Sequence, residues 1–310
     1  MQTQLQSNQK LSNKQTNFQV WWRLMRPHTL TAAFVPVLLG TTLAFLETNI
    51  DVLLFSAMLI ASLLIQAATN MINEYFDYKR GLDTEESVGI GGTIVRDGVK
   101  PKVILNLAFV FFGIATLLGV YICMSSSWWV ALVGLICMAV GYLYTGGPLP
   151  ISSTPFGELA SGLFMGVIII LLSFFIQTGY VSAISVLISI PIMILVGAIN
   201  MSNNIRDLDG DKKNGRKTLP ILLGRKNAIK FLAVLFLISY AWIIVLALMG
   251  TSTLWSLLAL ASIPKAVQAV KGFIGKSEPI QMMPAMKATA QTNTFFGLLL
   301  SIGLFIGYFM

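Results

Sequence analysis

The stretch SVLISIPIMILVGAINMSNNIRDLDGDKKNGRKT, Ser185–Thr218, is a long apolar run that ends in a dense group of charges. With its flanks, the apolar part covers residues 183–205. About 20 apolar residues in a helix cross the ~30 Å hydrocarbon core of a bilayer, so this part predicts a membrane-spanning helix. Asn203–Thr218 then contains three aspartates and five basic residues. We ask why a membrane helix should end in so many charges.

Similar apolar runs recur along the whole chain. The chain has 310 residues, 55% of them hydrophobic and 11% charged, and a mean hydropathy of +0.77. This pattern predicts an all-α polytopic membrane protein with about nine transmembrane helices and excludes a soluble domain. The expected spans cover residues 29–46, 52–76, 103–123, 128–145, 156–178, 183–205, 228–249, 253–271 and 289–309.

The basic residues test this topology. All 21 Lys and Arg residues fall before the first span or around alternate connections, whereas the other connections carry only Glu47 and Asp51. The positive-inside rule therefore predicts a multi-pass cell-membrane protein with a cytoplasmic N-terminus and the C-terminus on the opposite side. Topology and anionic lipid account for the net charge of +8, so we expect no nucleic-acid partner. Residues 1–20 are predicted to be a disordered cytoplasmic tail, and residues 21–310 a single transmembrane domain.

Most of the acids lie at the cytoplasmic ends of the second and sixth spans. At 100° per residue, two polar sets each occupy one helix face. They are Gln66, Asn70, Asn73 and Asp77 in the second span, and Asn200, Asn203, Asp207 and Asp211 in the sixth. Both contain N-x-x-N-x-x-x-D, which predicts two related halves that each contribute an acidic arm to one cavity. Asp209 would point away from that face.

Facing carboxylates among basic residues suit a magnesium-diphosphate site. Mg²⁺ takes one or two protein carboxylates together with waters and phosphate oxygens. Nearby Lys and Arg side chains would neutralise the remaining phosphate charge. An EF-hand is excluded, because Lys212 stands where its glycine turn is needed and Thr218 where its last ligand belongs. The P-loop pattern is absent from the sequence.

These motifs resemble the UbiA superfamily of intramembrane prenyltransferases. Asn73, Asp77 and Asp83 are similar to its first motif, and Asp207 with Asp211 to its second. RPHTLTAAFVPVLLGT at 26–41, YTGGPLP at 144–150 and NNIRDLDGDKKNGRKTLPILLG at 203–224 resemble the branch that prenylates 1,4-dihydroxy-2-naphthoate. Two departures occur: Glu74 stands where an Asp often follows the Asn, and Asp83 comes two residues later than usual. The longer spacing is typical of the naphthoate branch.

The resemblance implies a UbiA-type bundle, Mg²⁺ as cofactor, and polyprenyl diphosphate and an aromatic acid as substrates. The chain would be transferred with loss of diphosphate and CO₂. The implied metal ligands are Asp77, Asp83, Asp207 and Asp211, and the implied catalytic residues are Asp77, Asp207, Asp211 and Asn73. The expected substrate-binding residues are Asn70, Lys79, Arg96, Asn203, Arg206, Lys212, Lys217, Tyr142, Tyr144 and Glu158.

Several interpretations remain open at this stage. Glu158 is a candidate general base or an ordinary acid at a helix N-terminus. Tyr142 and Tyr144 either line the acceptor site or only pack. The acceptor is the naphthoate, 4-hydroxybenzoate or homogentisate. A secondary transporter also has repeats and buried polar residues, but its charges would lie near the membrane centre. Prenyl chain length and oligomeric state do not follow from the sequence.

Overall fold

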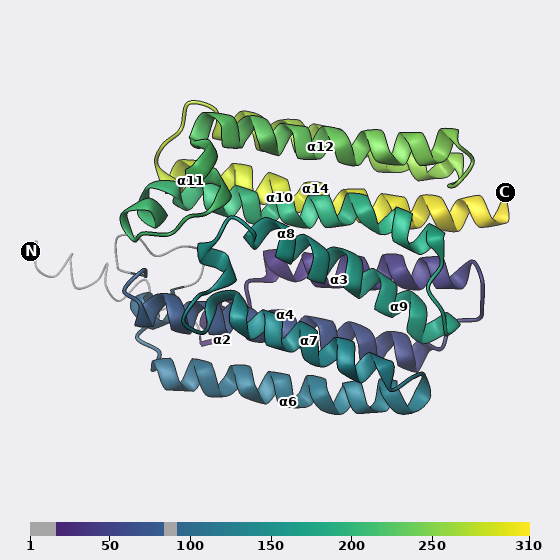
Figure 1. Cartoon of the computed structure of the whole chain (residues 1–310), viewed down its shortest axis with the longest axis horizontal. Helices are drawn as coiled ribbons and strands as arrows, with labels where there is room; N and C mark the ends of the chain where they lie inside the picture. Colours follow the sequence, from purple (N-terminus) through teal and green to yellow (C-terminus); the bar gives the residue numbers. More distant parts are fainter. Residues whose placement is uncertain (1–16, 84–91) are drawn as a thin grey trace, which may run out of the picture.

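A computed structural model describes residues 17–83 and 92–310 as a bundle of roughly parallel helices, without a strand in that part of the chain (Figure 1). In the labels used here, η1 and η3 are 3₁₀ helices and η2 is a π-helix. The elements are α2 (Asn17–Leu24), α3 (Pro27–Phe45), α4 (Val52–Lys79), α5 (Thr93–Asp97), α6 (Pro101–Ser125), α7 (Trp129–Thr145), η1 (Ile151–Ser153), α8 (Gly157–Ser161), η2 (Gly162–Ile168), α9 (Ile169–Thr178), α10 (Ala183–Lys213), α11 (Leu219–Leu223), α12 (Arg225–Leu248), η3 (Leu254–Ser262), α13 (Ile263–Phe273) and α14 (Pro279–Phe309).

Local sequence signals explain where the two longest polar-ended helices begin. The Asp51 carboxylate accepts the backbone amides of Leu53 and Leu54 at 2.8 and 3.0 Å, which caps α4. Ser182 caps α10 in the same way, because its hydroxyl accepts the Ser185 amide at 3.1 Å. Asp51, one of the two acids expected opposite the basic loops, is therefore a helix cap.

The expected count of nine membrane spans is not confirmed. Six described helices are long and apolar enough to cross a membrane, and two shorter apolar helices occupy residues 29–45 and 129–145. The six are Val52–Lys79, Pro101–Ser125, Gly157–Thr178, Ala183–Lys213, Arg225–Leu248 and Pro279–Phe309. The expected eighth span, residues 253–271, is instead a 3₁₀ segment, η3, followed by the short helix α13.

The bundle has two outer groups with a layer between them. In Figure 1, α10, α12 and α14 lie along one side, α4, α6 and α7 along the other, and α3 with α8 and α9 between. The largest buried cluster contains side chains of α3, α9, α10, α12 and α14. Apolar helices that pack against several neighbours in this way are typical of the core of a helix bundle. By contrast, α6 exposes Phe109, Val110, Ile114 and Leu117, as expected for a face in contact with lipid tails.

The last residues of the predicted N-terminal tail are part of a helix. The helix α2 begins at Asn17, so residues 17–20 are helical rather than part of a tail. Residues 1–16 of that prediction lie outside the described part of the chain, as do residues 84–91.

Candidate functional site

The acidic ends of α4 and α10 keep their helical geometry. The helix α4 continues to Lys79 and α10 to Lys213, so both polar faces keep their predicted phase. On α10, the Asp211 side chain is only 9% exposed and the Asp209 side chain 66% exposed. Asp209 pairs with Arg225 at 2.7 Å instead. The prediction that Asp209 points away from the polar face is therefore confirmed.

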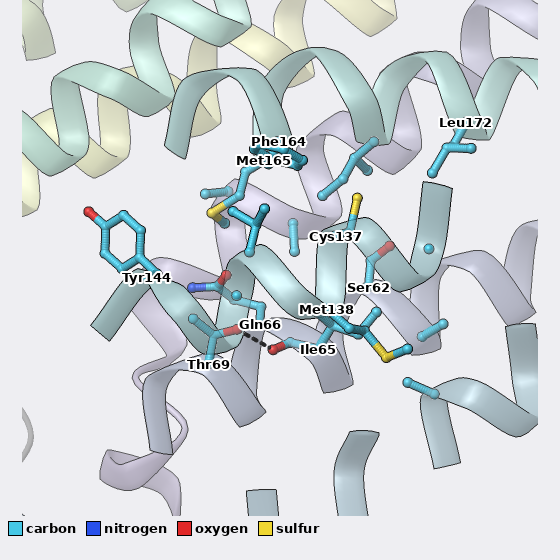
Figure 2. A pocket seen from close by; sticks show the side chains of 18 of the residues that line it. Ser62, Ile65, Gln66, Thr69, Cys137, Met138, Tyr144, Phe164, Met165 and Leu172 are labelled. Atoms are coloured by element: carbon cyan, nitrogen blue, oxygen red, sulfur yellow. Dashed lines mark hydrogen bonds between the residues drawn. The ribbon is translucent and has the colours of Figure 1, made fainter. Parts of the chain in front are cut away.

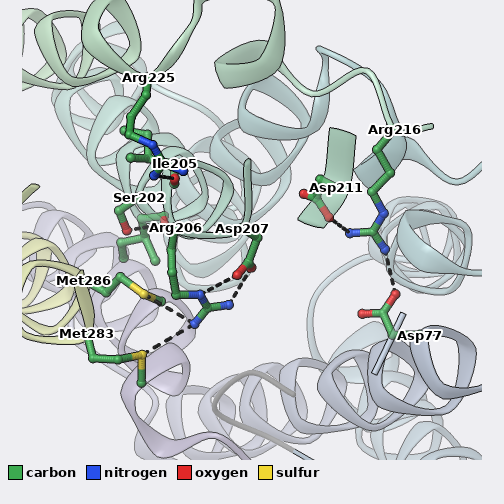
Figure 3. Close-up of polar contacts among 11 residues, drawn as sticks. Asp77, Ser202, Ile205, Arg206, Asp207, Asp211, Arg216, Arg225, Met283 and Met286 are labelled. Carbon is green, nitrogen blue, oxygen red and sulfur yellow. Dashed lines mark hydrogen bonds and ion pairs between the residues drawn. The ribbon is translucent and has the colours of Figure 1, made fainter. Parts of the chain in front are cut away.

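An arginine joins the two acidic arms. Gly215, at φ +75°, turns the chain back after α10, and the next side chain, Arg216, reaches between the helices. Its guanidinium donates to Asp77 at 2.7 Å and to Asp211 at 3.1 Å (Figure 3). Burial opposes the charge of Arg216, but the two carboxylates outweigh it and raise the pKa of the guanidinium. Arg216 therefore stays charged and pairs with one carboxylate from each arm, which balances one of their two negative charges.

A second arginine covers the remaining acid of α10. Arg206 forms a fork with Asp207, with contacts of 2.6 Å to Oδ1 and 2.5 Å to Oδ2. The other guanidinium nitrogen of Arg206 faces the thioethers of Met286 at 3.3 Å and Met283 at 3.7 Å (Figure 3). Arg206, predicted to bind substrate, thus lies at the acidic site but is paired with a carboxylate.

The predicted four-carboxylate metal centre is not assembled among the described residues, where no three His, Cys, Asp or Glu side chains converge on one point. Arg216 lies between Asp77 and Asp211, and Arg206 occupies Asp207, so guanidinium groups supply the positive charge.

The acids nevertheless fit a divalent cation. Burial, and after it the negative charge of Asp77, raise the pKa of the Asp83 carboxyl to about 6. Asp83 therefore lies close enough to the first arm to be affected by its charge. The Oδ2 atom of Asp211 is buried without a hydrogen-bond partner among the described residues. Crowded carboxylate oxygens with free lone pairs are the donor set that Mg²⁺ prefers.

The predicted asparagines form hydrogen bonds to different helices. Asn70 donates to the Met25 carbonyl and the Thr29 hydroxyl, both at 2.9 Å, and so ties α4 to the start of α3. Asn73 accepts the Thr145 hydroxyl and ties α4 to the end of α7. Asn70, Asn73 and Asn203 all line the cavity described below.

The predicted lysines are not drawn into the acidic cluster. Lys79, Lys212 and Lys217 are exposed, and Arg96 is exposed on α5. Instead, the cations that act on Asp77 are Arg216, Arg26 and Arg80. The composition of a basic loop does not show which of its lysines and arginines will reach the acidic side chains.

The sequence suggested no site role for Arg26, whereas Arg80 was expected among the loop cations that neutralise phosphate charge. Arg26 lines the cavity and has φ +50°, the only described residue other than glycine with a positive φ. Such a conformation costs about 1–2 kcal/mol and often marks a functional position. Arg80 instead donates to the Thr145 and Gly147 carbonyls at 2.5 and 2.9 Å, which fixes the end of α7.

A largely apolar cavity of about 440 Å³ begins about one helical turn from the acids, at Asn73 and Asn203. Figure 2 shows part of its lining. Its lining along α7 runs from the N-cap residue Trp128 to Tyr144, a length of about 24 Å at 1.5 Å per residue. Side chains of α3, α4, α6, α8, η2, α9 and α10 complete the wall. Tyr144 and Asn200 mark the polar end, so the cavity leads from the acids into the apolar interior.

The two predicted tyrosines separate here. Tyr144 lines the cavity, as expected for a residue of the acceptor site. Among the described residues, Tyr142 is not part of that lining, and its ring packs edge-on against Phe76 with centroids 5.8 Å apart. Tyr142 therefore packs toward α4 instead of lining this cavity, because two positions along a helix differ in direction by about 200°, and its role in substrate binding stays a prediction. Glu158 is buried beneath the same end, and its Oε1 accepts from Asn204 at 2.8 Å.

An apolar intramembrane cavity that opens at an acidic, arginine-rich mouth suits an enzyme whose substrate has an anionic head and a long apolar tail. The chain belongs to the UbiA prenyltransferase family, which it matches over residues 33–279. This membership agrees with the resemblance in the motifs and removes the transporter alternative.

The chain is 61% identical over 308 residues to the 1,4-dihydroxy-2-naphthoate octaprenyltransferase of Bacillus subtilis (strain 168), with 99% of each chain covered. It is 27% identical to the protein of that name from Escherichia coli (strain K12), over 93% of this chain and 96% of the other. A solved UbiA homolog from Archaeoglobus fulgidus, bound to GPP and Mg²⁺, matches with a TM-score of 0.64 and 18% identity. The match covers 91% of this chain and 99% of that one, and shows a shared fold.

Proposed function

We propose that the protein transfers a polyprenyl chain from polyprenyl diphosphate to 1,4-dihydroxy-2-naphthoate, a step of menaquinone biosynthesis, with loss of diphosphate and CO₂. The observation that carries the proposal is the 61% identity, over 99% of both chains, to a Bacillus subtilis protein named for this acceptor. The long spacing between Asp77 and Asp83, which resembles the naphthoate branch, supports the same acceptor.

Asp77, Asp83, Asp207 and Asp211 would hold Mg²⁺ in this proposal. The bound ion would supply charge neutralisation for the diphosphate. The buried, unpartnered oxygen of Asp211 and the raised pKa of Asp83 support this ligand set. The relative solved with GPP and Mg²⁺ is consistent with metal use.

The arginines would change partners when the substrate binds. Arg216 and Arg206 are held by carboxylates, and a diphosphate offers oxygen pairs that a planar guanidinium can also bind through two N–H groups. Their guanidinium groups would then stabilise negative charge on the diphosphate as the allylic C–O bond breaks. The prenyl chain would lie in the apolar cavity, which excludes water from the allylic carbon.

Turnover with three acceptors tests the proposal. Purified protein in lipid would be incubated with Mg²⁺, a polyprenyl diphosphate, and 1,4-dihydroxy-2-naphthoate, 4-hydroxybenzoate or homogentisate. We expect product and released CO₂ only with the naphthoate, and loss of product when EDTA is added, with recovery on excess Mg²⁺. Product with 4-hydroxybenzoate and none with the naphthoate would refute the assignment.

The location is part of the same proposal. The acidic site lies at the end of the bundle where α4 and α10 end and the basic loops connect the helices. The positive-inside rule assigns that end to the cytoplasmic face of the cell membrane. Lys212→Cys and Glu47→Cys would place a thiol at an exposed position at either end of the bundle. Labelling of each variant from outside and inside sealed vesicles would report the orientation of the protein in the membrane.

A further inference from the structure

Two buried polar atoms near the mouth of the cavity have no hydrogen-bond partner in the described chain. One is Oε2 of Glu158, whose side chain is fixed through its other oxygen by Asn204. The residue as a whole is 7% exposed. The other atom is Nδ2 of Asn200, one helical turn before Asn204 on α10. Burying an acceptor and a donor without partners is unfavourable, so a pair of them indicates a place for a ligand.

The absence of a side chain at Gly157 leaves open a space that one of these atoms, Asn200 Nδ2, faces. A Cβ atom at Gly157 would lie 3.2 Å from Asn200 Nδ2 and 3.4 Å from the Tyr144 hydroxyl. The polar groups of Asn200 and Tyr144 therefore converge on the space that a side chain at position 157 would fill. Both residues also line the apolar cavity. The π-helical segment η2 begins a few residues later, and such segments are frequent at functional sites.

This polar group lies between the cavity and the acidic cluster. The Tyr144 hydroxyl lies next to the Asn200 side chain and is within electrostatic range of Glu158, Arg216 and Asp77. A ring held here would be next to the position where the allylic carbon leaves the diphosphate.

We propose that Glu158, Asn200 and Tyr144 bind a ring hydroxyl of the aromatic acceptor, and that Glu158 removes its proton. This inference rests on the proposed function. A hydroxyl donates and accepts at once, so its proton meets Glu158 Oε2 while its oxygen accepts from Asn200 Nδ2. The acceptor's carboxylate does not fit here, because it would place a second negative charge against Glu158.

The proton transfer balances without another reactant. The hydroxyl O–H bond breaks, the proton moves to Glu158 Oε2, and the electron pair remains on the ring oxygen and enters the ring. The ring carbon forms its new bond to the allylic carbon as the allylic C–O bond breaks. The electron pair of that bond leaves with the diphosphate. The bond between the attacked ring carbon and its carboxylate then breaks, CO₂ leaves, and the bonding pair restores the aromatic ring while the ring oxygen takes a proton back.

A cycle of two enzymes and two acceptors tests this role. Wild type and Glu158→Gln would each be assayed with 1,4-dihydroxy-2-naphthoate and with its two monomethyl ethers. We expect Glu158→Gln to lower kcat with the dihydroxy acceptor at least about 100-fold, the usual range for a general base. With one of the ethers, wild type should be as slow as the variant, because the proton that Glu158 takes is missing. An equal loss from Glu158→Gln with all three acceptors would overturn the inference.

Binding measurements separate this role from a folding defect. Thermal stabilisation by Mg²⁺ and polyprenyl diphosphate should be the same in wild type and Glu158→Gln. Glu47→Gln, which removes an exposed carboxylate at the opposite end, is the matched control and should leave kcat unchanged. Asn200→Ala should raise the acceptor KM about tenfold, the value of one hydrogen bond. An unchanged KM would overturn the assigned hydroxyl site.

The two proposals fail in different ways. If wild type makes no product from the naphthoate, the proposed function is wrong. If wild type makes the product and Glu158→Gln makes it at the same rate, the function stands and the role of Glu158 is wrong.

Discussion

Three aspartates within five residues of α10 offer a matched test of the site. Asp207, Asp209 and Asp211 would each be changed to alanine, so that every variant loses one negative charge from the same helical turn. At 100° per residue, Asp207 and Asp211 differ by 40°, whereas Asp209 lies about 160–200° away from both. The three variants therefore differ mainly in the direction from which the charge is removed.

The expected sizes follow from the contacts. Asp209 is 66% exposed and makes one ion pair with Arg225, so its loss should cost at most about 1 kcal/mol and leave kcat/KM within about twofold. Asp207 and Asp211 face the acidic cluster and are proposed ligands. Substitution of a residue that only hydrogen-bonds to a metal ligand typically lowers metal affinity or activity about 10- to 100-fold. Loss of Asp207 or Asp211 itself should therefore lower kcat/KM by more than about 100-fold.

The assay is product formation against Mg²⁺ concentration, with thermal unfolding of each variant as a control for folding. Because Asp207→Ala leaves the guanidinium of Arg206, only 10% exposed, without its partner, Asp207→Asn would be measured beside it. Equal loss of activity at Asp207, Asp209 and Asp211 would refute the helical geometry and mean that the end of α10 unwinds when substrate binds.

Three further changes have defined outcomes. Arg216→Gln should raise the KM for polyprenyl diphosphate about 10- to 100-fold with Arg216→Lys in between, since the guanidinium reaches both acidic arms; an unchanged KM would contradict its proposed role. Gly134→Leu should favour short prenyl diphosphates over long ones at least tenfold in kcat/KM, because Gly134 lines the cavity and a Cβ there meets nothing within 4 Å. Glu74→Gln should lower the free energy of unfolding by about 1–3 kcal/mol, measured in denaturant, because buried Glu74 accepts the Thr93 hydroxyl and the Ile94 amide.

Much of the architecture could be predicted because its signals are local. Hydropathy over about 20 residues identifies membrane helices, and most expected spans coincide with long helices. The region of η3 and α13 departed from the expected span, since composition does not distinguish a continuous α-helix from a 3₁₀ segment followed by a short helix. The phase of Asp209 against Asp211 was predictable because it depends only on helical period.

The sequence did not show which residues the polar side chains of the site would contact. Asn70 and Asn73 share a predicted face, yet one bonds the start of α3 and the other the end of α7. Tyr142 and Tyr144 are two residues apart, but only Tyr144 reaches the cavity. Each outcome depends on which helix lies beside that face.

The sequence by itself determined the membrane class, the acidic faces of two helices and the resemblance to a prenyltransferase family, because hydropathy, periodicity and motif spacing are properties of consecutive residues. Only the tertiary structure decided that Arg216 joins Asp77 to Asp211 and that Glu158 and Asn200 keep unpaired polar atoms beside the cavity. Those relations join residues as many as 139 positions apart, from Asp77 to Arg216, and arise from the packing of α4, α8 and α10 around one space. A carboxylate's position in the sequence does not reveal whether an arginine, a metal or a hydroxyl will face it.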